Sequence, residues 1–363
     1  MALNHSPSIV TNGLVMYYDM SNTKKSWKGA PTTNLFGDVV NYSGLGSYWY
    51  NLDTNTKSIM LSVSYASWCV YFVATLTANS SHTFSCEHRS DVPGSTFVLD
   101  NDGVDDNTWN ATVTSTTEWQ RYTFTRTNIS AGQMNMYIRR NSGGNIYVRN
   151  VQIESTLFAT PFVNGTRSNT QAIVDLTNNN TLTATSLTYA NDGTFSFNGS
   201  SSWIELPTSS LFDSQSITME SWNKPTATAQ SGFLFEKGQV NTQYSNFYNS
   251  DGTFYFRTIG LSPQDLTFAA ATHIIAGQWN HIVCVVGSGT KTVYINGVQR
   301  YQQTGVTGTI PTGQTNQYVG KYGGGAINYP FNGSIGVSKV YNRALTETEV
   351  QQNFQALRGR YGI

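Results

Sequence analysis

Turn dipeptides beside alternating aromatic runs recur in the second half of the chain. Asp-Gly precedes such a run in NDGTFSF (191–197) and in SDGTFYF (250–256), and Asn-Gly lies at the centre of TVYINGVQR (292–300). Asn, Asp and Gly accept the positive φ angles that a tight hairpin turn requires, so these segments predict β-hairpins. Short β-like runs between Gly, Asn and Asp turns recur almost throughout, which is typical of sandwiches and jelly rolls.

The composition supports the same fold class. Aromatic residues make up 13% of the 363 residues and charged residues only 12%. Such a composition favours strands over helices, which are rich in Glu, Lys and Ala. The chain is too long for one ordinary β-domain and suits two. We therefore predict an all-β protein of two β-sandwich or jelly-roll domains.

A short C-terminal helix is the one exception. The segment LTETEVQQNFQAL offers Thr346 as N-cap with Glu349 three residues later, which predicts a capping box. Val350, Phe354 and Leu357 then share one face of the helix. Because so short a helix is marginal in water by itself, we expect this face to dock on a sandwich.

Charge and hydropathy exclude several classes of partner. Lys plus Arg and Asp plus Glu number 21 each, so the net charge is zero and no basic stripe is present for nucleic acid. The N-terminal segment MALNHSPSIV has no signal-peptide pattern, and no apolar run approaches the roughly 20 residues that span a bilayer. We predict no nucleic-acid partner, no membrane partner and no secretory signal.

Motifs after residue 195 resemble the laminin-G-like, concanavalin A-like lectin/glucanase sandwich. They read, in order, FSFNGSSSWIELP, SITMESWNKP, FLFEKG, WNHIVCVVGSGTKTVYINGVQ, YVGKY and FNGSIGVSKVYNRALTETEV. The resemblance covers about 190 residues and implies the sandwich fold. It implies function less sharply, because the same sandwich serves lectins, glycosidases and structural modules.

The first strand of that sandwich is separated from the rest. GLVMYYDMSN (13–22) resembles the family's first strand, yet the expected continuation, DLTNNN, begins only at Asp175. The stretch between contains NLFGDVVNYSG, HTFSCEHRSD, TEWQRYTFTRT and IYVRNVQIE, which resemble the strands of a carbohydrate-binding-module-like jelly roll. Insertion is tolerated where the inserted domain's ends lie close together. We predict an N-terminal arm (1–12), a first strand (13–34), an inserted jelly roll (35–165) and the remainder of the sandwich (166–363).

The opening segment, the junction LFATPFVNGTRS and the insertion pattern resemble virion structural proteins of tailed bacteriophages, particularly cyanophages. The resemblance implies a virion surface protein made in the host cytoplasm, serving in capsid decoration or as a fibre component. Its implied partners are other virion proteins, cell-surface glycans and further copies of the chain, with a trimer preferred to a dimer. We expect MALNHSPSIV to be a contact element, so that removal of residues 2–10 releases the protein from particles and leaves the melting temperature nearly unchanged.

A glycosidase of this fold needs two carboxylates beside the scissile bond, commonly from an E-x-D-x-x-E strand. No such stretch occurs, and SITMESWNKP supplies only Glu220. His281 in WNHIV belongs to a strand motif of the family and has no nucleophile motif with it. We predict that the protein is not an enzyme and has no catalytic residues. The alternatives are a phage glycan hydrolase or depolymerase and a soluble lectin.

Two loops offer aromatic rings with neighbouring amides, as sugar binding requires. The candidate carbohydrate-binding residues are Tyr48, Trp49, Tyr50, Trp109 and Asn110. For Trp49 and Trp109 a core position is an equal alternative. Trp119, Trp222 and Trp279 lie in predicted strands, so we expect these three in the core.

An acidic cluster is the candidate metal site. Asp100, Asp102, Asp105 and Asp106 surround a glycine in DNDGVDDN, and carboxylates are ligands for calcium. The loop lacks the distal Glu of an EF-hand, and a solvated turn is the favoured alternative. We predict no cofactor apart from such a structural calcium ion.

Overall fold

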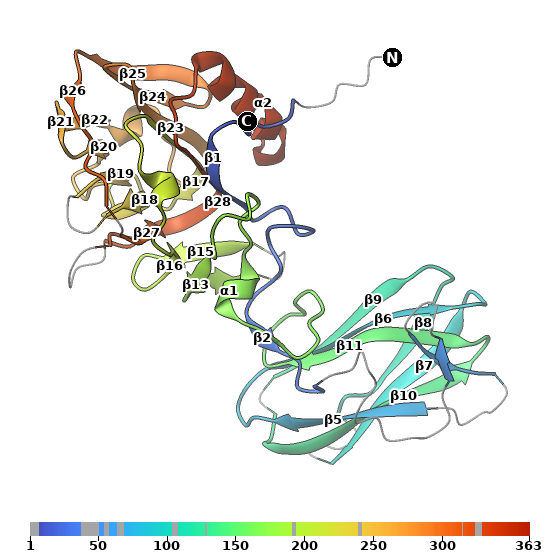
Figure 1. The fold of residues 1–363 in the computed structure, drawn as a ribbon. Helices are drawn as coiled ribbons and strands as arrows, with labels where there is room; N and C mark the ends of the chain where they lie inside the picture. The colour runs from blue at the N-terminus through green and yellow to red at the C-terminus, as the bar shows by residue number, and fades with distance from the viewer. Residues whose placement is uncertain are drawn as a thin grey trace, which may run out of the picture. The chain divides into compact units, whose positions relative to one another are not determined.

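A computed structural model describes residues 7–37, 51–53, 58–63, 69–103, 108–127, 129–190, 194–238, 242–313, 315–323 and 329–363. The chain divides into two compact units. Unit 1 combines residues 1–29 with 169–363, and unit 2 comprises residues 30–168. Figure 1 shows both units as mostly β structure.

An eight-stranded antiparallel sheet forms one layer of unit 1. β1 (Leu14–Asp19) pairs with β28 beside the main path of the sheet. That path runs β14 (Thr188–Tyr189), β15 (Phe195–Asn198), β28 (Asn332–Tyr341), β17 (Ile217–Pro225), β23 (Asn280–Gly287), β24 (Thr290–Ile295) and β25 (Val298–Thr304).

A seven-stranded antiparallel sheet forms the second layer. Its order is β13 (Thr183–Thr185), β16 (Trp203–Leu206), β27 (Gln317–Val319), β18 (Gly232–Lys237), β19 (Tyr244–Tyr248), β20 (Thr253–Thr258) and β22 (Asp265–Ala269). Buried side chains of both sheets, among them Met219 and Cys284 from the first and Leu234 and Phe254 from the second, form one hydrophobic core. Unit 1 is therefore a two-sheet sandwich.

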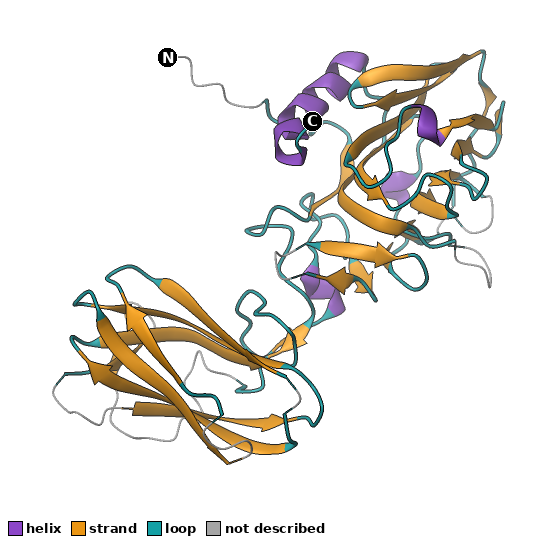
Figure 2. Cartoon of the chain, turned by 180° about the vertical axis from the view of Figure 1, so that it is seen from behind, coloured by secondary structure: helices purple, strands orange, loops and turns teal. Residues whose placement is uncertain are grey.

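Helical structure is sparse in unit 1. Its remaining elements are α1 (Asn169–Ala172), two 3-10 turns (Ser210–Phe212 and Ala270–Thr272), the ribbon of β21 (Leu261–Ser262) with β26 (Thr307–Gly308), and α2 (Glu347–Tyr361). None of the described helices is long and apolar enough to cross a membrane. Figure 2 shows how strongly strands predominate.

Unit 2 is a second sandwich with its own core. One sheet has the order β5 (Cys69–Leu76), β10 (Gly132–Ser142), β7 (Ser95–Gly103) and β8 (Ala111–Ser115). The other has the order β3 (Asn51–Asp53), β4 (Ser58–Leu61), β11 (Ile146–Glu154), β6 (His82–Ser90) and β9 (Gln120–Arg126). Phe72, Phe97 and Met136 from the first sheet pack with Phe84 and Val148 from the second. The predicted fold class, all-β sandwiches with a short C-terminal helix, is confirmed.

The two ends of unit 2 leave it side by side. β2 (Thr32–Thr33) pairs with β12 (Thr166–Arg167), and the Asn34 N–H donates to the Gly165 carbonyl at 2.7 Å. Within unit 1 the flanking segments also meet, because the Lys28 N–H donates to the Ala172 carbonyl at 2.8 Å and Trp27 bridges to Ile173. The structure divides the chain at residues 29/30 and 168/169, where the sequence placed the divisions at 34/35 and 165/166.

The C-terminal helix is capped and docked as its sequence indicates. Thr346 and Glu349 form the capping box, and Val350, Phe354 and Leu357 are buried. The Phe354 ring stacks on Trp222 of β17, with ring centroids 5.8 Å apart and planes 3° from parallel. The helix therefore covers the face of the eight-stranded sheet that points away from the main core.

The N-terminal arm corrects one expectation. Val10 is buried, its N–H donates to Asn353 Oδ1 at 2.8 Å, and its carbonyl accepts from the Tyr341 hydroxyl at 3.1 Å. Gln352 also donates to the Ser8 carbonyl at 2.6 Å. Residues 8–10 thus contact α2 and β28, so we now expect removal of residues 2–10 to lower the melting temperature.

Deletion of residues 30–168, with a short Gly-Ser linker in their place, should leave unit 1 folded. The reason is that Lys28 and Ala172 already lie within hydrogen-bond distance, so a short linker closes the gap. A single cooperative thermal transition by circular dichroism is the expected result. Deletion of residues 7–29 is the control and should abolish that transition, because it removes buried β1. A non-cooperative melt of the first deletion would contradict the prediction.

Candidate functional site

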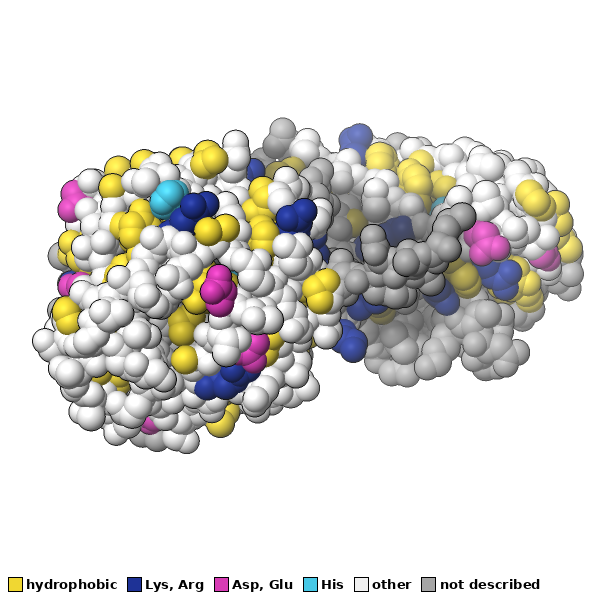
Figure 3. Space-filling view, turned by 90° about the horizontal axis from the view of Figure 1, so that it is seen from above, with side chains coloured by type: hydrophobic (Ala, Val, Ile, Leu, Met, Phe, Trp, Pro, Cys, Tyr) yellow, Lys and Arg dark blue, Asp and Glu magenta, His cyan; other side chains and the backbone are white. Residues whose placement is uncertain are grey.

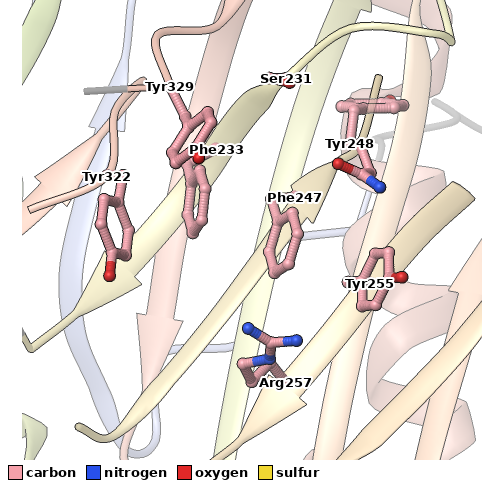
Figure 4. Close-up of a pocket in the computed structure, with 9 residues that line it drawn as sticks. Ser231, Phe233, Phe247, Tyr248, Tyr255, Arg257, Tyr322 and Tyr329 are labelled. Atoms are coloured by element: carbon pink, nitrogen blue, oxygen red, sulfur yellow. The ribbon is translucent and has the colours of Figure 1, made fainter. Parts of the chain in front are cut away.

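A cavity of about 310 Å³ lies on the outer face of the seven-stranded sheet (Figure 4). Side chains alternate between the two faces of a strand. In β20, Phe254 and Phe256 enter the core, so Tyr255 and Arg257 point outward. The residues that line the cavity are Ser231, Phe233, Phe247, Tyr248, Asn249, Tyr255, Arg257, Tyr322 and Tyr329. We call this cavity the aromatic pocket.

Rings from three neighbouring strands, β18, β19 and β20, form the floor of the aromatic pocket. The Phe233 and Phe247 rings stack at a centroid distance of 4.4 Å, and Phe247 and Tyr255 stack at 4.8 Å, within 12° and 4° of parallel. The two phenylalanines are at most 9% exposed. Tyr255 and Tyr322 are partly exposed and Tyr329 is 39% exposed, so these three tyrosines present the accessible aromatic surface.

Arg257 is the charged side chain of the pocket, and it is neutralised. Its Nε donates to Asp265 Oδ1 at 2.8 Å and its Nη2 to Asp265 Oδ2 at 2.9 Å. The hydrogen bond that Arg257 donates to Asp265 raises the pKa of Arg257, against the opposing effect of burial. The guanidinium also lies 5.4 Å from the Phe247 centroid, a cation–π distance. The pocket therefore combines aromatic surface with polar groups and little net charge.

Glu236 lies beside the aromatic pocket but does not line it. Only 4% of its surface is exposed, and one carboxyl oxygen accepts the Gly323 N–H. Burial raises the pKa of Glu236 to about 8, although the Gly323 N–H and the Lys321 ammonium act in the opposite direction. The small cavity that Glu236 does line has a volume of about 10 Å³, far below what a sugar needs.

Glu220 is fully buried, and both of its carboxylate oxygens have hydrogen-bonding partners. Lys339 Nζ donates to Glu220 Oε1 at 2.7 Å, His281 Nε2 lies 3.1 Å from the same oxygen, and Asn353 Nδ2 donates to Oε2 at 2.6 Å. Burial alone would raise the pKa of Glu220, but Lys339 and His281 outweigh it and hold the pKa at about 2. A carboxylate without access to solvent and with its oxygens occupied has a structural role.

Only two of the five predicted sugar-binding residues, Trp109 and Asn110, lie within the described part of the chain. Tyr48, Trp49 and Tyr50 lie outside the described residues. Trp109 is wholly buried and meets Phe124 edge-on at 5.6 Å, so the binding prediction for Trp109 is wrong and its core alternative holds. Asn110 beside it is exposed.

The expectations for the other tryptophans need correction at two positions. Trp222 is fully buried, as expected. Trp279 lies just before β23 and not in a strand, and it is partly buried against Tyr361, with ring centroids 4.6 Å apart. Trp119 is not in a strand: it lies in the loop before β9 and is partly exposed, because the strand begins one residue later.

The acidic cluster is only partly within the described residues. Asp105 and Asp106 lie outside them. Asp100 accepts from Arg139 Nε at 2.8 Å, and Asp102 accepts from Asn135 at 2.6 Å and Tyr137 at 2.9 Å. Among the described residues no three His, Cys, Asp or Glu side chains gather as a metal would require. Asp100 and Asp102 instead bind neighbouring side chains of β10.

The aromatic pocket was not predicted from the sequence, for an identifiable reason. The strand pattern of SNFYNSDGTFYFR places aromatic residues on both faces, which signals an aromatic outer face as well as a core. However, Tyr322 and Tyr329 reach the pocket from a loop more than 60 residues away in sequence. Only the pairing of β27 with β18 brings them there.

Replacement of Glu236 by Gln should flatten the pH dependence of stability. The carboxyl binds its proton more tightly in the folded state, so between about pH 4.5 and 8 its contribution to stability falls as pH rises. The wild-type protein should lose up to about 1.4 kcal/mol per pH unit relative to Glu236→Gln over this range. Urea denaturation at pH 5, 7 and 9 measures the difference. Parallel curves for the two proteins would contradict the prediction.

Comparisons with known proteins give a family match within unit 1. Residues 197–351 match the family described as the concanavalin A-like lectin/glucanases superfamily. No curated protein matches the chain.

Several solved structures align with about half of the chain. Domain 4 of AbnA, a GH43 extracellular arabinanase from Geobacillus stearothermophilus in complex with arabinotriose, is 23% identical over 49% of this chain and 91% of its own, with a TM-score of 0.39. The receptor binding domain of botulinum neurotoxin mosaic serotype C/D is 10% identical over 52% of this chain and 49% of its own, with a TM-score of 0.42. The binding domain of botulinum neurotoxin DC in complex with SialylT is 13% identical over 52% and 50%, with a TM-score of 0.41.

The chain thus spans about half the length of these toxin domains. The match over residues 197–351 agrees with the two packed antiparallel sheets of unit 1. Over residues 197–351, unit 1 is therefore similar to the concanavalin A-like lectin/glucanase, laminin G type of β-sandwich.

Proposed function

We propose that this chain is a non-enzymatic, carbohydrate-binding surface protein of a bacteriophage particle. The aromatic pocket of unit 1 is the observation that carries the binding function. Sugar rings have apolar C–H faces and a rim of hydroxyls, so they are held by aromatic surface with nearby hydrogen-bonding groups. The tyrosines of the pocket supply the aromatic surface. Ser231, Asn249 and the phenol hydroxyls supply the hydrogen-bonding groups.

The size and charge of the pocket limit the kind of saccharide that it can bind. A volume of about 310 Å³ is at the lower end for small-molecule sites, which suits one or two sugar units at a chain end. The Arg257 charge is taken up by Asp265, so no net charge is offered to an acidic group. The pocket favours a neutral saccharide, bound weakly enough that several copies on one particle would act together.

Carboxylate placement supports a non-enzymatic role. Hydrolysis requires two carboxylates that reach the substrate. The described lining of the aromatic pocket contains neither Asp nor Glu. Glu220 is enclosed beneath α2 and Glu236 is shielded from the pocket.

A glycan hydrolase is the second candidate, and one observation favours it. A pKa near 8 keeps Glu236 protonated at neutral pH, which is the state a general acid needs. A movement of the 321–323 segment, whose Gly323 N–H binds this carboxyl, would be required to expose it. A soluble lectin acting away from any particle remains the third reading.

The particle assignment rests on the sequence resemblance to tailed-phage virion proteins. Surface chemistry is compatible with it, because Figure 3 shows few and scattered charged side chains on the face in view. Attachment would then depend on short-range contacts with other virion proteins and with copies of the same chain, a trimer by the same resemblance.

Variants of the tyrosines test the pocket. Tyr255→Ala and Tyr322→Ala should each weaken binding of neutral oligosaccharides about 5- to 30-fold, the usual effect of losing one stacked ring. Tyr255→Phe is the matched control and should keep most of the affinity, since it retains the ring. A neutral glycan array followed by calorimetry on the best ligand gives the measurement.

Two results of that experiment would count against the proposal. Failure of the wild-type protein to bind any neutral glycan, or unchanged affinity in both alanine variants, would remove the pocket assignment. Release of new reducing ends from the bound glycan by the wild-type protein, lost in Glu236→Gln, would favour the hydrolase.

The particle location has its own test. Mass spectrometry of phage particles purified by density gradient should find this chain in fixed stoichiometry with the major capsid protein, and the chain should remain after a wash in high salt. Its recovery only in the soluble lysate fraction would instead support a soluble lectin.

A further inference from the structure

The outer face of the five-stranded sheet in unit 2 holds a row of planar side chains. Tyr147 of β11 lies opposite Arg89 of β6 in the strand register, and Arg149 lies opposite Glu87. The alternate residues His88 and Val148 are buried, so this row faces away from the core. Trp119 lies between the two arginines, with Arg89 5.5 Å and Arg149 3.9 Å from its ring centroid.

The two arginines differ in their partners. Arg149 Nε donates to Glu87 Oε2 at 2.8 Å, so its charge is balanced. The Arg89 guanidinium lies 4.3 Å from the Tyr147 ring centroid, but no hydrogen bond or ion pair joins it to any residue within the described part of the chain. Its Nε is buried without an acceptor. A buried donor left unpaired is costly, and the cation–π contacts do not satisfy its N–H groups.

We propose that Arg89, held between Tyr147 and Trp119, anchors a second binding site, which takes a sugar that carries a carboxylate. A guanidinium is planar and binds a carboxylate through two parallel hydrogen bonds. The rings on either side restrict its rotation, so little side-chain entropy is lost on binding. The site does not depend on the aromatic pocket of unit 1.

The flanking rings favour an acidic sugar over other anions. In a uronic or sialic acid the carboxylate is attached directly to the ring, so a carboxylate on Arg89 brings ring C–H groups close to Tyr147 and Trp119. Nucleic acid is disfavoured because residues 30–168 carry ten Asp and Glu against eight Lys and Arg. An acidic peptide carries its carboxylate on a flexible side chain and has no ring to place against these two residues.

The test uses the full chain and an array of uronate- and sialate-containing oligosaccharides, each printed beside its methyl ester. The ester keeps the sugar and removes the charge. At least one acid form should bind, and its ester should bind about tenfold more weakly or worse, as expected for loss of a charge-assisted hydrogen-bonded pair. Arg89→Gln should lose the same factor, and Arg89→Lys should fall between them.

Arg140→Gln is the matched control. It removes the same charge from β10 of the other sheet, where Arg140 donates to the Gly143 and Gly144 carbonyls, so acid binding should persist. Binding of neutral glycans in unit 1 should persist in Arg89→Gln, which separates the two sites.

Several results would overturn the proposal. They are the absence of binding to every acid form, equal binding of acid and ester, or wild-type affinity in Arg89→Gln. Binding restricted to sulfated controls, or full competition by polyglutamate, would also reject a carboxylate-bearing sugar as the ligand. The ester comparison needs no variant, so the proposal can fail even if Arg89→Gln does not fold.

Discussion

A buried carboxylate organises the outer face of the larger sheet in unit 1. Glu220 on β17 has no contact with water and is bound by Lys339 on β28, His281 on β23 and Asn353 on α2. Asn353 also accepts the Val10 N–H, so the arm before β1 joins the same network. A charge removed from water is tolerated only when its partners are in place. Three strands, the C-terminal helix and the N-terminal segment are therefore positioned together.

Two-faced strands explain how each sandwich supports a surface site. In β20 the core takes Phe254 and Phe256, which leaves Tyr255 and Arg257 on the outer face. Unit 2 repeats the principle with Arg89 outside and its neighbours inside. The decisive difference is the partner of the arginine. Asp265 cancels the charge of Arg257, whereas no described carboxylate pairs with Arg89, and for this reason we propose ligands of different charge for the two faces.

Insertion of one sandwich into the other requires little structural change in either domain. The ends of unit 2 pair as β2 and β12, and the interrupted segments of unit 1 meet at Trp27 and Ile173. β1 pairs with β28, more than 300 residues away in sequence, along five residue pairs with one register shift between Leu14 and Met16. This arrangement leaves each core complete within its own unit.

Local chemistry in the sequence was enough to predict the class of fold, the hairpins and the C-terminal helix. The Asn296-Gly297 turn and the Thr346 capping box depend on residues within a few positions of one another, and both form as predicted. Burial of particular aromatic rings did not follow from the sequence. Trp109 faces the core although it sits in a polar loop, while Trp119 is partly exposed because β9 starts after it. The aromatic pocket and the Arg89 row join residues from separate strands and loops, so the long-range register of the sheets decides them.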